Sequence, residues 1–192
     1  EKFGDRLSAA LIDETIYPAL SNGFSDINAY LRELTLKSMQ HFAPKLSQKT
    51  LNQSLLKFLA RLQVDPEPSI RANTTVLLGF IADHLGEASC KRILLNAFGR
   101  ALKDQFPPTR IAALKALVAT KKYYSSSEVA NKVIPSVSPL CIDGVEEAKQ
   151  NALSCLEVFV KVLREAAAAS EMEPTEETLP TETKTSSQGY VS

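Results

Sequence analysis

The sequence predicts an all-α protein, an α-solenoid of about four HEAT-like helical hairpins followed by a disordered acidic C-terminal tail. The main observation is an internal repeat, because basic residues recur every 39 positions, at Arg32, Arg71, Arg110 and Lys149. An aspartate precedes each of them by six positions, and apolar residues occupy the same offsets around all four. In addition, the chain has only 7 glycines in 192 residues, which is few for an all-β fold built on tight turns. Self-similarity at a fixed period of this length is typical of stacked helical units.

Each repeat begins with a helix whose apolar positions lie on one face. They fall 16, 12 and 9 positions before the basic residue, and spacings of four and three place side chains on the same side of a helix. Pro18 and Pro135 occupy one column inside these helices, and we interpret them as kinks or late helix starts. The apolar columns are formed by Ile16, Leu55, Leu94 and Val133, by Leu20, Leu59, Phe98 and Val137, and by Leu62, Ala101 and Leu140.

A turn and a second helix follow each aspartate. Pro or Gly lies close by in the last three units, as in Asp65-Pro66, Asp143-Gly144 and residues 104–108, and these residues favour turns and the first turns of helices. The second helix carries small or apolar residues 3, 7 and 10 positions after the basic residue, which again share one face. These positions hold Thr35, Met39 and Phe42; Thr74, Leu78 and Ile81; Ala113, Leu117 and Thr120; and Ala152, Leu156 and Phe159.

The hairpins are expected at about 7–43, 47–86, 88–124 and 125–165, within one array that covers residues 1–165. One hairpin cannot bury its apolar stripe alone, so stacked neighbours complete the core. A 39-residue period with an aspartate in the turn and an arginine six positions later resembles HEAT repeats, an armadillo-type solenoid. Tetratricopeptide and ankyrin repeats, at about 34 and 33 residues, do not fit this period.

The paired acidic and basic columns admit a catalytic or a structural interpretation. An active site would occur once, whereas these pairs occur once per repeat, which favours a ladder in which each aspartate accepts hydrogen bonds at its turn and each arginine braces a neighbouring turn. We therefore assign no catalytic residues, and we expect the ladder to comprise Asp26, Arg32, Asp65, Arg71, Asp104, Arg110, Asp143 and Lys149.

Residues 166–192 differ from the array in composition. They carry five Glu and one Lys, whereas residues 1–165 carry 21 basic and 17 acidic residues. Four alanines continue the last helix for a turn, and the Glu-, Thr- and Ser-rich stretch that follows has almost no apolar residues. This composition is typical of a disordered linker or tail. We interpret it as a solubilising spacer, with phosphorylation as the alternative.

Several functional classes find no support. No apolar run is long enough to cross a membrane, and no glycine-rich phosphate loop or kinase motif is present, so we expect no membrane insertion, cofactor or small-molecule substrate. His41 and His84 are too far apart in sequence to suggest a metal site. The odd number of cysteines suggests reduced, intracellular core thiols at Cys90, Cys141 and Cys155. Because the sequence starts with Glu1 rather than Met, we expect it to be a fragment.

The third unit is strongly basic. Between residues 88 and 127 there are eight basic residues and one acid, Asp104. Arg110 belongs to the ladder, which leaves seven cations for a strip that could bind RNA or an acidic peptide, with two tyrosines as stacking surface. The alternative is a solvated helix face. The candidate surface comprises Lys91, Arg92, Arg100, Lys103, Lys115, Lys121, Lys122, Tyr123 and Tyr124.

The stretch Ser69-Ile70-Arg71-Ala72-Asn73-Thr74-Thr75-Val76-Leu77-Leu78-Gly79 resembles the central HEAT region of the N-terminal kinase-like (Scy-like) pseudokinase family. Further stretches that resemble the same family lie at residues 43–46, 58–63, 106–110 and 132–135. The resemblance covers roughly residues 10–165, and the Asn-Thr-Thr stretch is its most specific part.

The resemblance implies a non-enzymatic scaffold, because the family's kinase-like domain is degenerate in catalytic residues and lies outside this chain. Animal-type members of the family act with coatomer in Golgi-to-endoplasmic-reticulum vesicle traffic, which implies protein partners and a cytoplasmic, Golgi-associated location. Fungal members are linked to tRNA export, so the alternative is a tRNA-binding adaptor that uses the basic third unit. A third hypothesis, that the region completes an active site elsewhere, finds no titratable cluster to support it.

Overall fold

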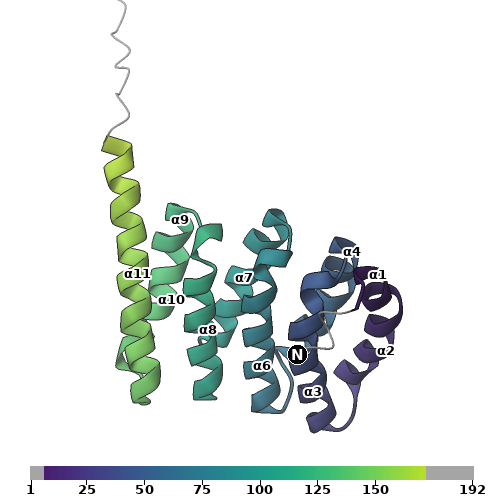
Figure 1. Ribbon diagram of the computed structural model, residues 1–192. Coiled ribbons are helices and arrows are strands. Elements are labelled where there is room, and N and C mark those ends of the chain that lie inside the picture. Colours follow the sequence, from purple (N-terminus) through teal and green to yellow (C-terminus); the bar gives the residue numbers. More distant parts are fainter. Residues whose placement is uncertain (1–6, 172–192) are drawn as a thin grey trace, which may run out of the picture.

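The computed structural model describes residues 7–171, and within this range it contains helices and no β-strand (Figure 1). Four helical hairpins follow one another along the chain, which confirms the predicted all-α solenoid. The expected disordered tail lies outside the described residues from position 172 onward. The second helices of the hairpins are α3 (Ala29–Phe42), α6 (Pro68–Ile81), α8 (Pro107–Ala119) and α11 (Glu146–Glu171).

Three of the four first helices contain one wide, π-helical turn, at Ile12–Ile16, Leu51–Leu55 and Val129–Val133. These turns occupy the same place in the repeat, and only the third unit has an uninterrupted helix, α7 (Glu87–Ala101). The other first helices are completed by short α-helical pieces, namely α1 (Ala9–Leu11) and α2 (Tyr17–Ser21), α4 (Gln48–Thr50) and α5 (Leu56–Leu62), and α9 (Ser126–Glu128) and α10 (Ile134–Val137).

The wide turns explain how proline is tolerated inside two of these helices. Pro18 and Pro135 stand at the starts of α2 and α10, directly after the π-helical turn. A proline has no N–H to donate and its ring collides with a carbonyl of the preceding turn, and a wider turn relieves both problems. In the second unit Lys57 takes the proline position and the wide turn is still present. The turn therefore does not depend on proline.

Serine side chains fix where three of the first helices begin. Ser8, Ser47 and Ser125 each accept a hydrogen bond from the backbone N–H three residues later, which satisfies an unpaired donor of the first turn. Glu128 returns the interaction to the Ser125 N–H and so completes a capping box. Short 3-10 turns connect the helices, at Asn22–Ser25, Ala43–Lys45, Ala82–His84, Lys121–Tyr123 and Ser138–Ile142.

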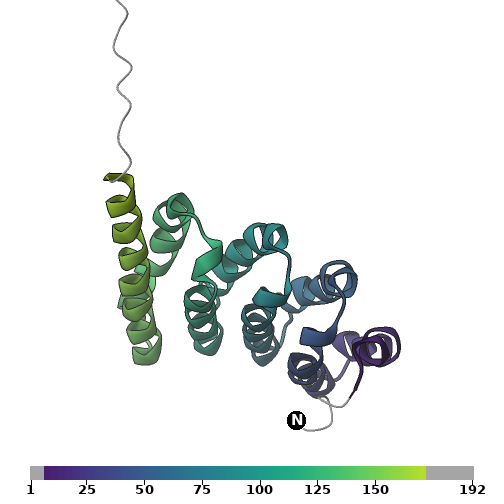
Figure 2. The same cartoon turned by 45° about the horizontal axis from the view of Figure 1, so that its top comes forward.

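The hairpins stack so that the second helices lie side by side in the order α3, α6, α8, α11. Figure 2 shows them as one row, with the first helices forming the other row. Helices α6 and α8 approach closely, since a Cβ placed on Gly79 would lie 3.0 Å from the Ala116 Cβ. The core runs along the whole stack, and its largest fully buried side chains include Phe98, Phe159, Leu55, Leu59 and Leu78.

Candidate functional site

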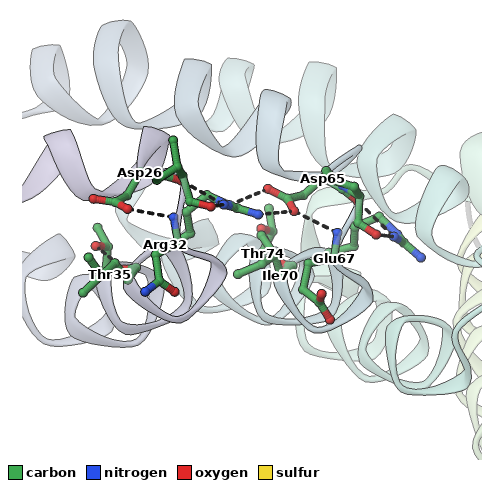
Figure 3. Close-up of polar contacts among 12 residues, drawn as sticks. Asp26, Arg32, Thr35, Asp65, Glu67, Ile70 and Thr74 are labelled. Atoms are coloured by element: carbon green, nitrogen blue, oxygen red, sulfur yellow. Dashed lines mark hydrogen bonds and ion pairs between the residues drawn. The ribbon is translucent and has the colours of Figure 1, made fainter.

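An arginine–aspartate ladder connects the turns of successive units (Figure 3). Arg32 forks onto the carboxylate of the next unit: Nε donates to Asp65 Oδ2 at 2.8 Å and Nη2 donates to Asp65 Oδ1 at 2.9 Å. The remaining amino group, Nη1, donates to the carbonyl oxygen of Asp26 in its own unit, at 2.8 Å. The arrangement recurs at Arg71 with Asp104 and at Arg110 with Asp143, with side-chain distances of 2.7 to 2.9 Å.

The ladder groups are fully engaged and largely buried. Each aspartate also accepts a backbone N–H two residues later, as from Glu67 onto Asp65 and from Phe106 onto Asp104. No side chain in the three ion pairs is more than 18% exposed. The hydrogen bonds from Arg71 and Arg110 lower the pKa values of Asp104 and Asp143. With their donors and acceptors occupied, these side chains offer nothing to a substrate and serve to join one unit to the next.

The two ends of the ladder differ from its rungs. Within residues 7–171 no cation pairs with Asp26, whose carboxylate accepts the Asn28 N–H at 2.8 Å. At the other end Lys149 replaces the arginine, and its Nζ donates to Glu146 in its own helix at 2.6 Å. The lysine therefore ends the ladder within the fourth unit.

The cations of the third unit fall into two groups. Three of them are paired with acids that lie outside the basic stretch: Lys91 with Glu87 at 2.7 Å, Lys115 with Glu147 at 3.8 Å and Lys122 with Asp83 at 2.9 Å. Counting charge within residues 88–127 misses these partners, because Glu87 lies one residue before the stretch in α7, and Asp83 and Glu147 come from the neighbouring units. Lys121 is exposed, and the side chain of Arg92 lies outside the described part of the structure.

The two tyrosines do not form the expected stacking surface. Tyr124 is buried, its ring centroid 6.2 Å from that of Phe159 and its hydroxyl 2.6 Å from Thr120 Oγ1, so the prediction that it stacks on a ligand is wrong. Burial raises the Tyr124 pKa well above its ordinary value. Tyr123 donates to Asp83 at 2.9 Å and lies beneath Lys122, which ties the turn after α8 to the turn after α6. Both rings therefore serve the packing of adjacent units.

Two other cations of the third unit and one cation of the fourth unit line a groove of about 850 Å³ between α7 and the first helix of the fourth unit. Arg100 and Lys103 come from the end of α7, and Lys132 comes from the facing wide turn. Lys132 was missed from the sequence because it belongs to the next unit. Asn96, Asn131 and Ser136 add polar groups, and the apolar lining is Leu95, Leu102, Leu117, Val133, Pro135, Pro139 and Leu140.

The three cations of this groove have no ion-pair partner inside the described structure. No acidic residue lines it, and Arg100, Lys103 and Lys132 form no ion pair within residues 7–171. Arg100 donates only to the neutral side-chain oxygen of Gln63, at 3.1 Å. The backbone N–H and hydroxyl of Ser125 donate to Glu128, one turn before Lys132, and these hydrogen bonds together with the charge of Lys132 lower the pKa of Glu128. Three cations around an apolar floor form a site suited to an anion with apolar character.

Three further features bear on function. Among residues 7–171 no group of three or more His, Cys, Asp or Glu side chains is arranged as a metal site. No described helix is long and apolar enough to cross a membrane. Cys90 and Cys155 are buried free thiols and Cys141 is half-buried, and burial raises the Cys155 pKa to about 12.

No protein-family model matches the chain, but two curated proteins with kinase-related names are similar to it. A probable inactive serine/threonine-protein kinase, scy1 of Dictyostelium discoideum, is 42% identical over 161 residues, which are 84% of this chain and 20% of that protein. The protein kinase domain-containing protein ppk3 of Schizosaccharomyces pombe is 37% identical over 160 residues, 83% of this chain and 25% of that protein. The chain therefore spans only a fifth to a quarter of these relatives.

A solved structure agrees with this result. The crystal structure of Cex1p matches 88% of the chain, and 32% of its own chain, with 30% identity and a TM-score of 0.77. The similarity thus covers the helical array as a whole. Together these matches confirm the predicted resemblance of this helical array to the Scy-like pseudokinase family.

Proposed function

We propose that this chain is a non-catalytic scaffold that binds an extended protein partner along its helical array. The observation that carries the proposal is the ladder, since the repeated charged groups are consumed in joining the units. The exposed surface of the second helices is left for partners, and it includes the apolar side chains Tyr30, Val76 and Phe80, which are 68%, 45% and 47% exposed. Exposed apolar groups on an otherwise polar helix row favour protein contacts.

The partner and the process follow from the family resemblance. Animal-type Scy-like pseudokinases act with coatomer, so we place the chain in coatomer-dependent Golgi-to-endoplasmic-reticulum vesicle traffic, in the cytoplasm and at the Golgi surface. The name of the scy1 relative, an inactive kinase, supports a role without catalysis.

A pull-down tests the scaffold proposal. The 192-residue chain is immobilised and purified coatomer is passed over it. We expect the wild type to retain coatomer and the Val76→Ala/Phe80→Ala variant to lose at least fivefold of it with an unchanged melting temperature. Val64→Ala, which truncates a 66% exposed residue in a turn, is the matched control. Failure of the wild type to retain coatomer would rule out the traffic role.

The basic groove favours a second candidate function, a tRNA-binding adaptor in tRNA export, as the resemblance to fungal family members implies. Arg100, Lys103 and Lys132 would contact phosphates, so binding should weaken with salt by about one log unit per log unit of salt for each phosphate contact. The measurement is the anisotropy of labelled tRNA at two salt concentrations. Lys103→Glu/Lys132→Glu should abolish binding and Lys121→Glu, outside the groove, should not. Equal affinity of all three proteins would exclude the groove as the tRNA site.

A further inference from the structure

The groove between α7 and the first helix of the fourth unit has the chemistry of a site for an acidic peptide. Arg100 and Lys103 come from one side and Lys132 from the other, no acid lines the groove, and the rest of the lining is mostly apolar. A segment in which carboxylates flank an apolar residue would meet cations on both sides while its apolar side chain enters the floor. We propose that the groove binds such a segment of a partner protein.

Gly99 leaves room for the backbone of this segment beside α7. A glycine inside a helix lowers stability relative to alanine, so its presence calls for a reason in the packing. Gly79 has one, because an added Cβ would lie 3.0 Å from the Ala116 Cβ, whereas an added Cβ at Gly99 would have nothing within 4 Å. Gly99 lines the groove. The missing side chain therefore serves no contact within the described chain, and it lets another backbone approach α7 closely.

The same lining favours a peptide over RNA. Single-stranded RNA stacks its bases on aromatic rings, and phosphates gain nothing from an apolar floor. Among the described residues no aromatic side chain lines the groove, and Tyr123 and Tyr124 are held in contacts between neighbouring units. Asn131 and Ser136 do line it, and such side chains can hydrogen-bond the backbone of an extended peptide.

The inference deepens the proposed scaffold function, on which it rests only in taking the ligand to be a protein. The groove lies between first helices, whereas Val76 and Phe80 belong to the second helix α6. The two surfaces can therefore be tested separately. The Val76→Ala/Phe80→Ala variant should bind the peptide as the wild type does, and a failed coatomer pull-down would leave the groove proposal standing.

The anisotropy of a labelled synthetic peptide tests the proposal on the intact 192-residue chain. The probe is Gly-Glu-Glu-Leu-Glu-Glu-Gly, and two comparison peptides replace its leucine by serine or its four glutamates by glutamine. We expect the probe to bind with a Kd of about 50 μM or tighter at low salt, and each comparison peptide to bind at least about fivefold more weakly. No binding of the probe, or equal binding of the serine peptide, would overturn the proposal.

Variants of the chain locate the binding. Lys103→Glu/Lys132→Glu should abolish it, whereas Lys49→Glu/Lys121→Glu, which changes the charge equally at exposed positions outside the groove, should weaken it by no more than about twofold. Gly99→Leu fills the groove without changing its charge and should weaken peptide binding at least about tenfold, with an unchanged melting temperature. Equal affinity of Gly99→Leu and the wild type would place the peptide outside the groove and overturn the proposal.

Labelled tRNA, measured with the same proteins, separates the two ligands. Binding of tRNA through the cations alone should be weakened by Lys103→Glu/Lys132→Glu and unaffected by Gly99→Leu, because the charges remain. The opposite pattern would replace the peptide with RNA as the ligand of the groove: tRNA lost in Gly99→Leu, while the glutamate probe binds no better than its glutamine version.

Discussion

Gly23 is the residue at which the first unit departs from the other three. Its column holds Leu62, Ala101 and Leu140 in the later units, and in the first unit a Cβ at this position would overlap the Thr35 Oγ1. Thr35 is buried and its hydroxyl donates to the Leu31 carbonyl oxygen at 2.8 Å, so it cannot easily turn away. The glycine is therefore required by the neighbouring helix.

We predict that Gly23→Ala destabilises the protein by about 1–3 kcal/mol, the cost of overpacking a well-filled core. Gly99→Ala is the control, because nothing lies within 4 Å of its added Cβ and alanine favours the interior of α7. That variant should be neutral or stabilised by up to about 1 kcal/mol. Urea unfolding midpoints measure both changes, and equal loss in the two variants would contradict this account of Gly23.

Predictions of which single residues are buried succeeded at positions where the same kind of residue recurs in every unit. Thr74, Ala113 and Ala152, placed on one inward face from their spacing, are fully buried. The same reasoning failed for Tyr124, whose neighbour Phe159 comes from another unit, and for Lys132, which meets Arg100 only across a groove. Periodicity predicts which face of a helix is buried, but contacts between units depend on how the hairpins stack.

At the scale of the elements, the helices were predicted well and their internal geometry was not. The second helices begin after the turn aspartates, where proline precedes or starts α6 and α8. The π-helical turns carry no sequence signal that separates the second unit, with Lys57, from the third, with Asn96 in the same column. Since a wide turn differs from an α-helical turn by one hydrogen-bond register, side-chain spacing does not reveal it.

The ladder joins elements of different units, and its strength should depend on pH. Hydrogen bonds from Arg71 hold the pKa of Asp104 below its ordinary value, so the folded state binds this proton less readily than the unfolded chain does. The stabilisation is therefore present above the unfolded pKa of about 3.9 and is lost as pH falls through the lower folded value. Asp143, held by Arg110, behaves in the same way.

We predict that Asp104→Asn costs about 3 kcal/mol at pH 7, since it leaves the mostly buried Arg71 without its charged partner. Between pH 5 and pH 3 the wild type should lose more stability than the variant, because only the wild type has this carboxylate to protonate. Urea titrations at the three pH values provide the measurement. Parallel losses in the two proteins would mean that the ladder carboxylate does not contribute to acid sensitivity.

At the scale of the whole molecule, stability comes from stacking, and the same column has different surroundings in different units. Leu114 of α8, a helix that packs against both α6 and α11, is 1% exposed, whereas Leu153, 39 residues later on α11, is 41% exposed at the end of the described array. Val160, on the same side of α11, is 39% exposed, and with Leu156 these residues line a shallow depression. Residues at the same repeat position are thus buried between stacked units and exposed at the end of the described array.

Leu114→Ala and Leu153→Ala therefore form a matched pair. We predict a loss of about 2–5 kcal/mol for Leu114→Ala, which leaves a cavity between two units, and a loss below about 1 kcal/mol for Leu153→Ala. Urea unfolding at two protein concentrations separates the possible outcomes. If Leu153→Ala were as damaging as Leu114→Ala and its effect grew with concentration, the end face would be covered by a second copy of the chain in solution. An equally large loss that did not vary with concentration would instead show that a segment of the same chain covers Leu153, since only a partner within the molecule is independent of concentration.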